Sequence, residues 1–466
     1  MIDVEATLNV VKTLAEKNDL ARREEYILAT GYKHVWETAN GLAIDALAQR
    51  YREWLTSASV VIDPTQLETD ETDILPELAA GLKKIAEYSI HSDLRADIMG
   101  CYGEVRSNYM LQTLQILFRN IDTTIKGTYT RGTHPFIVAV REFFRMAQRE
   151  AQFAAQVLST NCVADAVRRA IAHPADLVKM GAETVSTKVH KASAKHEFVD
   201  QIWLFDVIEV FNDMYVECLD VDVKETVRPA LVSVTTAGVD FMKELMDDVQ
   251  GTSRSIGTLT AAANATVFEQ TSAVLNCLKK MLEYERIIEA LLSSWSHKQW
   301  DYIVGPIATD AQNFATALYY QDLLKGLEIV IEKYSHGYKR PMVSVLFQLN
   351  NYNHILRSCA PLAHILVDGE GKYAEIVDSL QGEYVGYWRH TAALLEDGSQ
   401  RAAGSPPKER LKQFSAELEE HVKSQEGCAV PDAELRMTLI EKVQHEVTAV
   451  FIPFYNLYPI PIHFHL

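Results

Sequence analysis

Residues 346–356 of this chain read LFQLNNYNHIL and combine two patterns in one short segment. The apolar side chains recur with the spacing that is typical of a buried helix. That pattern does not explain Asn350, Asn351 and Asn353, because asparagine is a poor helix former whose side chain competes for backbone hydrogen bonds. We therefore expect a helix whose amides bond to backbone groups or to facing helices.

Helical spacing continues on both sides of this segment. Apolar residues at positions 74, 78, 82 and 85 step by four, four and three, which places them on one helix face. Strand-like runs occur at 59–62 and 231–234, and both are too short to build a sheet. The 21 glycines and 14 prolines among 466 residues are fewer than the usual roughly 7% and 5%. The pattern predicts an all-α chain, and the lack of a fixed repeat favours an irregular stack of helix pairs.

Four breaks interrupt the helical pattern. They are the acidic stretch that opens at Asp63-Pro64, the dipeptide His173-Pro174, the polar run 251–257 and the Gly/Pro-rich run 398–407. We interpret 63–73 and 398–407 as linkers, and 251–257 as a hinge. The predicted domains are an N-terminal bundle at 1–130 and further helical bundles at 131–250, 257–366 and 372–466, the last truncated or divergent after about residue 455.

The charge balance excludes one class of partner. There are 45 basic and 63 acidic residues, which gives a formal net charge of −18. Nucleic acid binding needs a basic face, so we expect no nucleic-acid partner. The first residues are acidic where a signal peptide would be basic, and no apolar run reaches the roughly 18 residues of a spanning helix. From these features we expect a soluble intracellular protein.

The sequence contains no complete catalytic motif among those considered. The segment 369–372 reads GEGK but lacks the spacing of a phosphate-binding loop. The acidic pair Asp247-Asp248 is followed by Gly251 where a third magnesium ligand would be needed, and the six cysteines lie too far apart for a zinc motif. We therefore expect no enzyme, no cofactor and no metal. Large helical chains of this kind are usually scaffolds, adaptors or tethers.

Two groups of basic residues stand out against the acidic background. The first lies between Arg168 and Lys195, and the second comprises Lys408, Arg410 and Lys412. Either group could be a solvated helix face. Either could instead contact anionic lipid head groups, where each base contributes about 1 kcal/mol near the surface.

Five segments, in this order, resemble the seventy-kilodalton subunit of the exocyst, the vesicle-tethering complex. They read YGEVRS at 102–107, LFDVIEVF at 204–211, GTLT at 257–260, LFQLNNYNHIL at 346–356, and KERLKQF at 408–414 followed by AVPD at 429–432. The fourth is the most specific, because a plain helical core does not require its run of amides. Together the segments extend the resemblance from about residue 75 to about residue 455.

The resemblance implies an elongated rod of stacked antiparallel helix pairs without catalytic activity. It implies a function in exocytosis, in which the protein tethers secretory vesicles to the plasma membrane. The implied partners are other exocyst subunits, a Rho-family GTPase and phosphatidylinositol 4,5-bisphosphate. The implied location is cytoplasmic and peripheral at the plasma membrane, at sites of polarised secretion.

The chain departs from the family at both ends. The family begins with a coiled coil, and we expect this chain to start after it; the tail from residue 456 carries Pro459 and Pro461 where the family has a basic helical end. Only Lys408, Arg410 and Lys412 match the family within its C-terminal domain, so these three are the candidate phosphoinositide-binding residues. The alternative is an all-α adaptor outside the exocyst, derived from the same rod, that has lost membrane binding.

Overall fold

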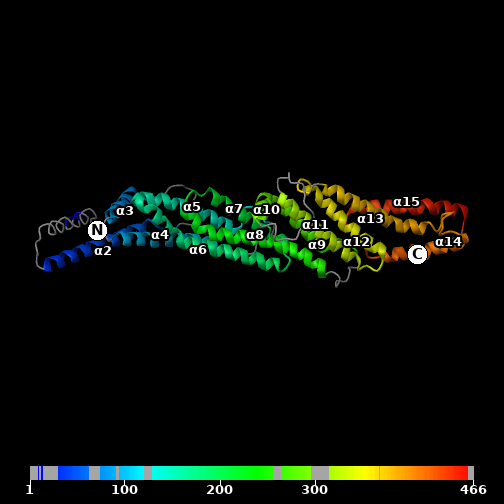
Figure 1. The fold of residues 1–466 in the computed structure, drawn as a ribbon, viewed down its shortest axis with the longest axis horizontal. Coiled ribbons are helices and arrows are strands. Elements are labelled where there is room, and N and C mark those ends of the chain that lie inside the picture. The colour runs from blue at the N-terminus through cyan, green and yellow to red at the C-terminus, as the bar shows by residue number, and fades with distance from the viewer. Residues whose placement is uncertain are drawn as a thin grey trace. The chain divides into compact units, whose positions relative to one another are not determined.

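The computed structural model describes residues 30–61, 74–90, 94–119, 129–255, 264–294, 314–366 and 368–459, together with Asn9, Lys12 and Thr13. Within these ranges the chain is helical and contains no β-strand (Figure 1). The all-α fold class is therefore confirmed. The expected linker at 63–73, the segment 257–260 and the tail from residue 460 lie outside the described residues.

The chain divides into two compact units, with unit 1 formed by residues 1–191 and 203–238, and unit 2 by residues 192–202 and 239–466. Unit 1 contains α2 (Thr30–Ser57), α3 (Pro76–Ser89), α4 (Leu94–Phe118), α5 (Pro135–Val157), most of α6 (Thr160–Ser193), α7 (Trp203–Glu217) and the first part of α8 (Val221–Ser255). Unit 2 contains the rest of α8, the 3₁₀ turns η2 (Phe198–Gln201), η4 (Leu282–Tyr284) and η5 (Ala360–Leu362), and the helices α9 (Glu269–Met281), α10 (Glu285–Ser294), α11 (Phe314–Ser335), α12 (Pro341–Cys359), α13 (Gly369–Ala392), α14 (Pro407–Gln425) and α15 (Ala433–Leu457). The predicted division into four bundles stays a prediction.

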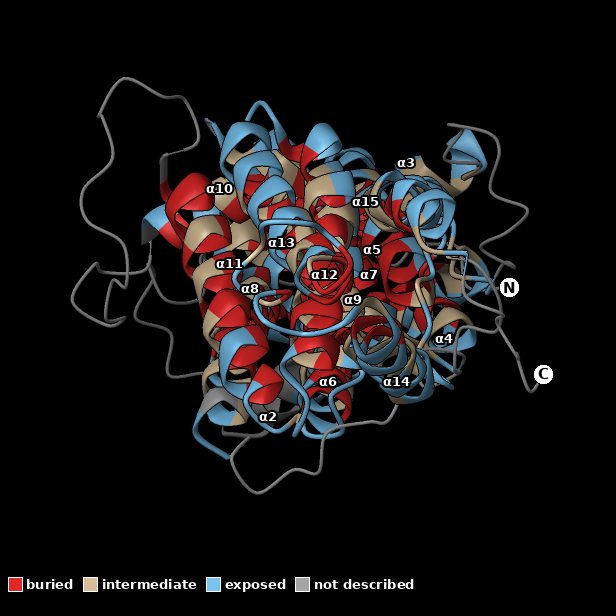
Figure 2. Ribbon diagram, turned by 90° about the vertical axis from the view of Figure 1, so that its right-hand side faces the viewer, coloured by how far each residue is buried: buried red, intermediate tan, exposed pale blue. Residues whose placement is uncertain are grey.

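In unit 1, α5 and α6 each bury one face, whereas α7 is buried on all sides from Trp203 to Glu209. Figure 2 shows helices on which buried and exposed residues lie on different sides. Helix α5 lies against α3, α4 and α7 and buries Phe136, Phe143 and Phe153. Each such side chain stabilises the fold by about 1.5–3 kcal/mol through the apolar area it removes from water. Helix α6 approaches this core closely at Gly181, where an added Cβ would lie 2.6 Å from the ring of Phe118.

In unit 2 the central helix is α12, which contacts α9, α11 and α13. Tyr352, near the end of α12, stacks on Tyr373, near the start of α13, with ring centroids 6.4 Å apart. This pairing fits an antiparallel arrangement of the two helices. Helix α15 packs on α13 through Leu435 and Leu439, whereas Phe454, near the end of α15, packs against Leu411 and Phe414 of α14.

The structure contradicts the predicted break at His173-Pro174, because α6 continues through Pro174. An internal proline removes one helical hydrogen bond and costs about 3 kcal/mol. Here a buried seam runs through the proline, with Ile171, Ala175 and Val178 all at most 3% exposed. Packing of that seam offsets the local cost.

The run 398–407 is also not a loose linker. Ser399 Oγ donates to the carbonyl oxygen of Ala393 at 2.6 Å, and the guanidinium of Arg401 donates both to the carbonyl oxygen of His390 and to the carboxylate of Glu417. These bonds attach the run to α13 on one side and to α14 on the other. It therefore forms an ordered turn.

A buried histidine fixes the start of α5. The Nδ1 atom of His134 accepts the backbone N–H of Phe136 at 3.2 Å, and its ring stacks on Trp203 of α7 at 4.3 Å. Burial, together with the positive charge of Lys188, lowers the pKa of His134 to about 4. Nδ1 must be unprotonated to accept the N–H of Phe136, so protonation of Nδ1 would remove the cap.

We expect His134 to make unit 1 sensitive to acid. A histidine whose folded pKa lies below its unfolded value contributes stability at neutral pH, and that contribution is lost as pH falls from about 6.5 towards 4. The loss should reach about 3 kcal/mol. His134→Asn keeps a capping acceptor without the titration, so hydrogen exchange of α5 peptides should depend less on pH in this variant. An unchanged pH dependence would contradict the assignment.

Candidate functional site

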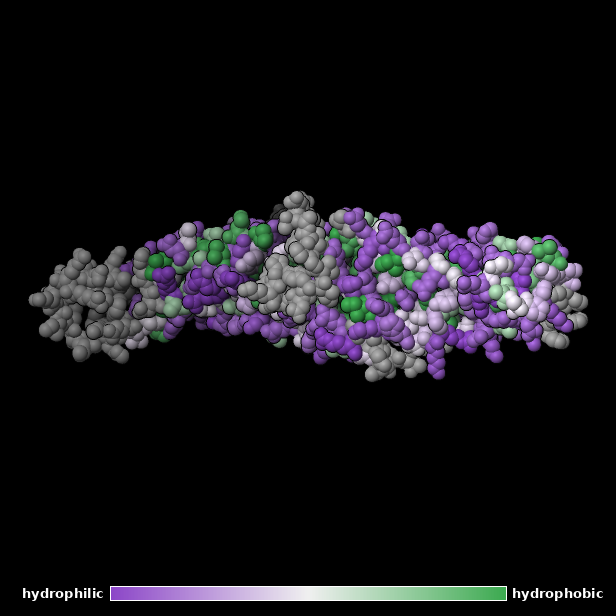
Figure 3. Space-filling model, turned by 45° about the vertical axis from the view of Figure 1, so that its right-hand side comes forward, coloured by the Kyte–Doolittle hydropathy of each residue, from purple (hydrophilic) through white to green (hydrophobic). Residues whose placement is uncertain are grey.

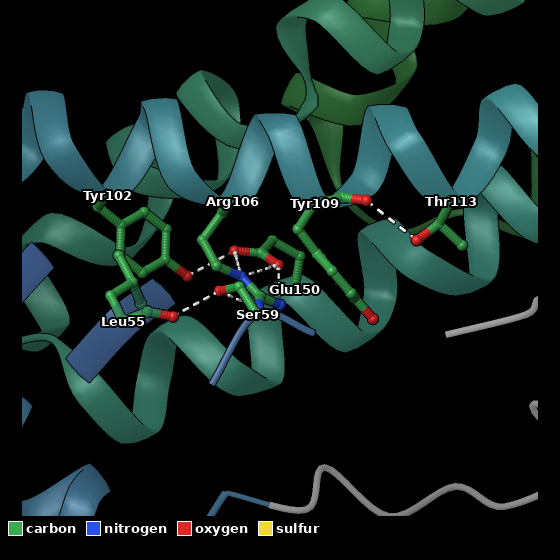
Figure 4. Close-up of polar contacts among 7 residues, drawn as sticks. All are labelled: Leu55, Ser59, Tyr102, Arg106, Tyr109, Thr113 and Glu150. Atoms are coloured by element: carbon green, nitrogen blue, oxygen red, sulfur yellow. Dashed lines mark hydrogen bonds and ion pairs between the residues drawn. The ribbon is translucent and has the colours of Figure 1, made fainter. Parts of the chain in front are cut away.

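The segment at 102–107 supplies the centre of a buried ion-pair cluster in unit 1 (Figure 4). Arg106 of α4 donates to Glu150 Oε2 of α5 from Nε at 3.0 Å and from Nη2 at 2.7 Å. Tyr102 donates its hydroxyl to Glu150 Oε1 at 2.6 Å. Arg106 Nη1 also donates to Ser59, just beyond α2, at 3.1 Å. One arginine therefore joins the end of α2 to α4 and α5.

This cluster is almost completely removed from water. The side chains of Arg106 and Glu150 are 7% and 1% exposed. The guanidinium lies 4.0 Å from the ring centroid of Phe153 and 4.5 Å from that of Tyr109. Burial and the charge of Glu150 raise the pKa of Tyr102 well above its ordinary value, so the phenol remains a neutral donor. Separating the pair would leave an unpaired buried charge, so the pair fixes which faces of α4 and α5 meet.

Glu150→Ala should destabilise unit 1 by about 3–5 kcal/mol, because Arg106 would then be buried without its partner. The double variant Arg106→Met with Glu150→Met should lose less stability than Glu150→Ala, because it leaves no unpaired charge in the buried site. Glu104→Ala is the control, because its pair with Arg52 is half exposed on the same helix and contributes at most about 1 kcal/mol. Hydrogen exchange of α4 and α5 peptides measures each change, and equal effects of Glu104→Ala and Glu150→Ala would contradict the account.

The segment at 204–211 binds the loop that leads into α5. Asp206 of α7 is 1% exposed and accepts the backbone N–H of Gly132 at 2.5 Å and the hydroxyl of Tyr129. Glu209 of α7, one turn further on, accepts a hydrogen bond from Arg131. Two acids on one helix therefore hold the loop at 129–134, and with it the start of α5.

The amides at 350–351 join three segments of unit 2. Asn350 Nδ2 donates to the carbonyl oxygens of Ala265 and Ala429, both at 2.8 Å. Asn351 Oδ1 accepts the backbone N–H of Phe268 at 2.9 Å, and its Nδ2 donates back to Phe347 within α12 at 2.8 Å. The expectation of bonds to backbone groups is confirmed for Asn350 and Asn351. They attach α12 to the segment that enters α9 and to the loop between α14 and α15.

Asn350→Ala should lower the stability of unit 2 by about 2–3 kcal/mol, because two buried carbonyls would lose their donor. Asn350→Asp has nearly the same shape but turns an acceptor towards both carbonyls, so its effect should be larger. Asn276→Ala, on the exposed face of α9, is the matched control and should change stability by less than about 0.5 kcal/mol. Equal stability of the alanine and aspartate variants at 350, measured by hydrogen exchange of α12, would contradict the role of Asn350 as donor to both carbonyls.

The three basic residues at the start of α14 do not share one surface. Lys408 and Lys412 are exposed one helical turn apart, with Glu409 between them. Arg410 is 5% exposed, donates to the carbonyl oxygen of Leu394 at 2.8 Å and pairs with Asp397 at 2.7 Å. Residues two apart point to different sides of a helix. The expected group of three is therefore corrected to two lysines, and Arg410 instead attaches α14 to the end of α13.

The other cations nearby are held in ion pairs. Arg401 pairs with Glu417 at 2.8 Å, and Arg389 pairs with Glu446 at 2.6 Å. Hydrogen bonds from these arginines lower the pKa of both glutamates. Lys408 and Lys412 have no ion-pair partner among the described residues. They are therefore the cations of α14 that remain available to an anionic ligand, together with Lys423 in its last turn.

The first basic group, which begins at Arg168 on α6, is partly neutralised. Arg168 pairs with Asp222 of α8 at 3.2 Å, and Arg169 pairs with Asp165 of its own helix at 3.0 Å. In the described ranges, no three histidine, cysteine or acidic side chains gather in a way that could hold a metal ion. None of the helices described is both long and apolar enough to cross a membrane.

A family model for the C-terminal part of the Exo70 exocyst complex subunit matches residues 130–464, which is more than half of the chain. The chain belongs to the Exo70 family. That family consists of exocyst subunits and is not an enzyme family. The match includes the acids of α7, the amides of α12 and the whole of α14 and α15.

Individual Exo70 relatives are distant in sequence. Human exocyst complex component 7 is 21% identical over 326 residues, which cover 65% of this chain and 44% of the human protein. The protein of the same name from Drosophila melanogaster is 24% identical over 314 residues, covering 61% of this chain and 45% of the fly protein. This chain therefore matches less than half the length of these curated relatives.

Solved structures of Exo70 show the same fold. Two structures of the Saccharomyces cerevisiae protein superpose with TM-scores of 0.65 and 0.66 at 14% and 13% sequence identity. The superpositions cover 97% and 98% of this chain, and 89% and 90% of the yeast chains. The fold is thus shared across the chain even where few residues are identical. The segments that resemble Exo70 contain the buried polar residues Arg106, Asn350 and Asn351.

Proposed function

We propose that this chain is a non-catalytic exocyst subunit that tethers secretory vesicles to the plasma membrane during exocytosis. Its proposed partners are other exocyst subunits, a Rho-family GTPase and, peripherally at the membrane, phosphatidylinositol 4,5-bisphosphate. The observation that carries the proposal is the Exo70 match over residues 130–464. The buried polar contacts of Asn350 support it, because they give a structural role to the amides within the matched range.

Lys408 and Lys412 support only a weak membrane contact. Each lysine near an anionic surface contributes about 1 kcal/mol, so the pair supplies about 2 kcal/mol, or roughly 30-fold in affinity. Glu409 lies between them, and the chain as a whole carries a net charge of −18. Stable recruitment to a membrane would therefore need other exocyst subunits in addition to this contact.

A second candidate function follows from the burial of Arg410. A chain that keeps the fold but presents only two lysines on α14 could act as an all-α adaptor outside the exocyst that has lost membrane binding. Co-purification separates the two functions. The exocyst proposal predicts that the tagged chain recovers other exocyst subunits in stoichiometric amounts, whereas the adaptor would recover none of them.

Vesicle flotation tests the membrane contact. The chain should float with vesicles that contain phosphatidylinositol 4,5-bisphosphate, weakly and less at higher salt, because exposed charges are screened. Replacing Lys408 and Lys412 by glutamate should abolish flotation without lowering the melting temperature. Lys423→Glu, at the other end of α14, is the matched control and should float like the unmodified chain.

Arg410 behaves differently under this proposal. Arg410→Gln should lower the stability of unit 2 by about 2 kcal/mol, because it removes charged hydrogen bonds from a buried site. At a temperature where the Arg410→Gln variant is folded, it should float with the vesicles to the same extent as the unmodified chain. Flotation that survives the double lysine variant, or that Arg410→Gln alone abolishes in the folded protein, would contradict the assignment to Lys408 and Lys412.

A further inference from the structure

The turn between α7 and α8 presents three aliphatic side chains to solvent. Val216 is 63% exposed, Leu219 is 95% exposed and Val221 is 70% exposed. Scattered exposed apolar residues are normal on a protein surface. Three exposed aliphatic side chains within six positions of one turn are less ordinary. The face of the molecule drawn in Figure 3 is mostly hydrophilic, and its hydrophobic residues lie in small groups.

The backbone of this turn is fixed by its own hydrogen bonds. Cys218 N–H donates to the carbonyl oxygen of Met214 at 3.0 Å and closes α7. Asp220 Oδ1 accepts the N–H of Val223 at 3.1 Å and caps α8. Lys224 Nζ donates across the turn to the carbonyl oxygen of Val216 at 3.3 Å. The three side chains are therefore presented on an ordered support, which reduces the entropy lost when a partner binds.

The turn is also attached to α6, which precedes it in the chain. Asp222, in the first turn of α8, binds Arg168 of α6 through both carboxylate oxygens at 3.3 Å and 3.2 Å. Lys224 lies 5.5 Å from the ring centroid of Tyr215. Apolar side chains surrounded by charged and hydrogen-bonded groups have the composition of a protein interface, with an apolar centre and a polar rim.

The charge around the turn identifies the kind of partner. Residues 213–228 contain five acids and two bases, and Arg168 adds one further base nearby. Glu217 is exposed between Val216 and Cys218. This excess of negative charge disfavours an anionic membrane. It equally disfavours a second copy of the chain, which carries the same net charge of −18.

We propose that the α7–α8 turn is a docking knob that inserts Val216, Leu219 and Val221 into an apolar pocket edged by lysine or arginine on another exocyst subunit. The proposal rests on the proposed function, because it places the partner within that complex. Leu219 is the central anchor, since it is the most exposed of the three. Glu217 meets the cation at the rim.

Photo-crosslinking in the assembled complex tests the knob. The chain with Leu219→p-benzoylphenylalanine is co-expressed with the other exocyst subunits, and the complex is purified and irradiated. Val232→p-benzoylphenylalanine is the matched control, because Val232 is 53% exposed on α8 of the same unit. Position 219 should crosslink to one subunit at least tenfold more than position 232. The mapped site should be apolar with a lysine or arginine beside it. Leu219→Asp should reduce recovery of that subunit.

Each other outcome overturns a defined part of the account. A complex that assembles normally but shows no preferential crosslink at 219 overturns the knob and leaves the proposed function standing. A crosslink to a second copy, or to lipid when anionic vesicles are added, overturns the proposed occupant. A chain that fails to join the complex overturns both the proposed function and the knob.

Discussion

A single buried amide joins three segments of unit 2. Asn350 uses both of its N–H groups on backbone carbonyls that are distant in sequence, at Ala265 and Ala429. Buried carbonyls need donors, and a helix interior has none to spare, so a side chain must supply them. Ala429 in turn donates its N–H to the carbonyl oxygen of Asn264 at 2.8 Å. The starts of α9 and α15 are thereby held at fixed positions against α12.

Unit 1 uses a different group for the same purpose. There the Arg106–Glu150 pair lies where α4 and α5 meet, and its removal from water makes any other arrangement costly. The segments by which the chain resembles Exo70 are thus largely those that fix helix packing. The fold matches those of the yeast structures at 13–14% identity. Apolar positions tolerate exchange among hydrophobic residues, whereas buried polar groups tolerate little.

The sequence predicted the helical class and the backbone bonding of Asn350 and Asn351, because periodicity and poor helix propensity are local signals. It could not reveal the partner of Arg106, since Glu150 lies 44 positions away and only the fold brings them together. The sequence did not predict that α6 continues through Pro174, because burial of the apolar side chains around the proline outweighs its tendency to break a helix. The burial of Arg410 could have been predicted: residues at 408, 410 and 412 cannot share one helix face.

Buried amides and ion pairs, more than surface charges, hold the helices of this chain in their packed positions. Single-residue hydrogen exchange of the unmodified protein tests it most directly at the backbone amides of Phe268 and Ala429. Both lie outside helices, where amides normally exchange fast. The account predicts protection in the same range as the central amides of α12, because Asn351 and the carbonyl of Asn264 accept their hydrogen bonds. Exchange of both amides at the rate of an exposed loop would contradict it.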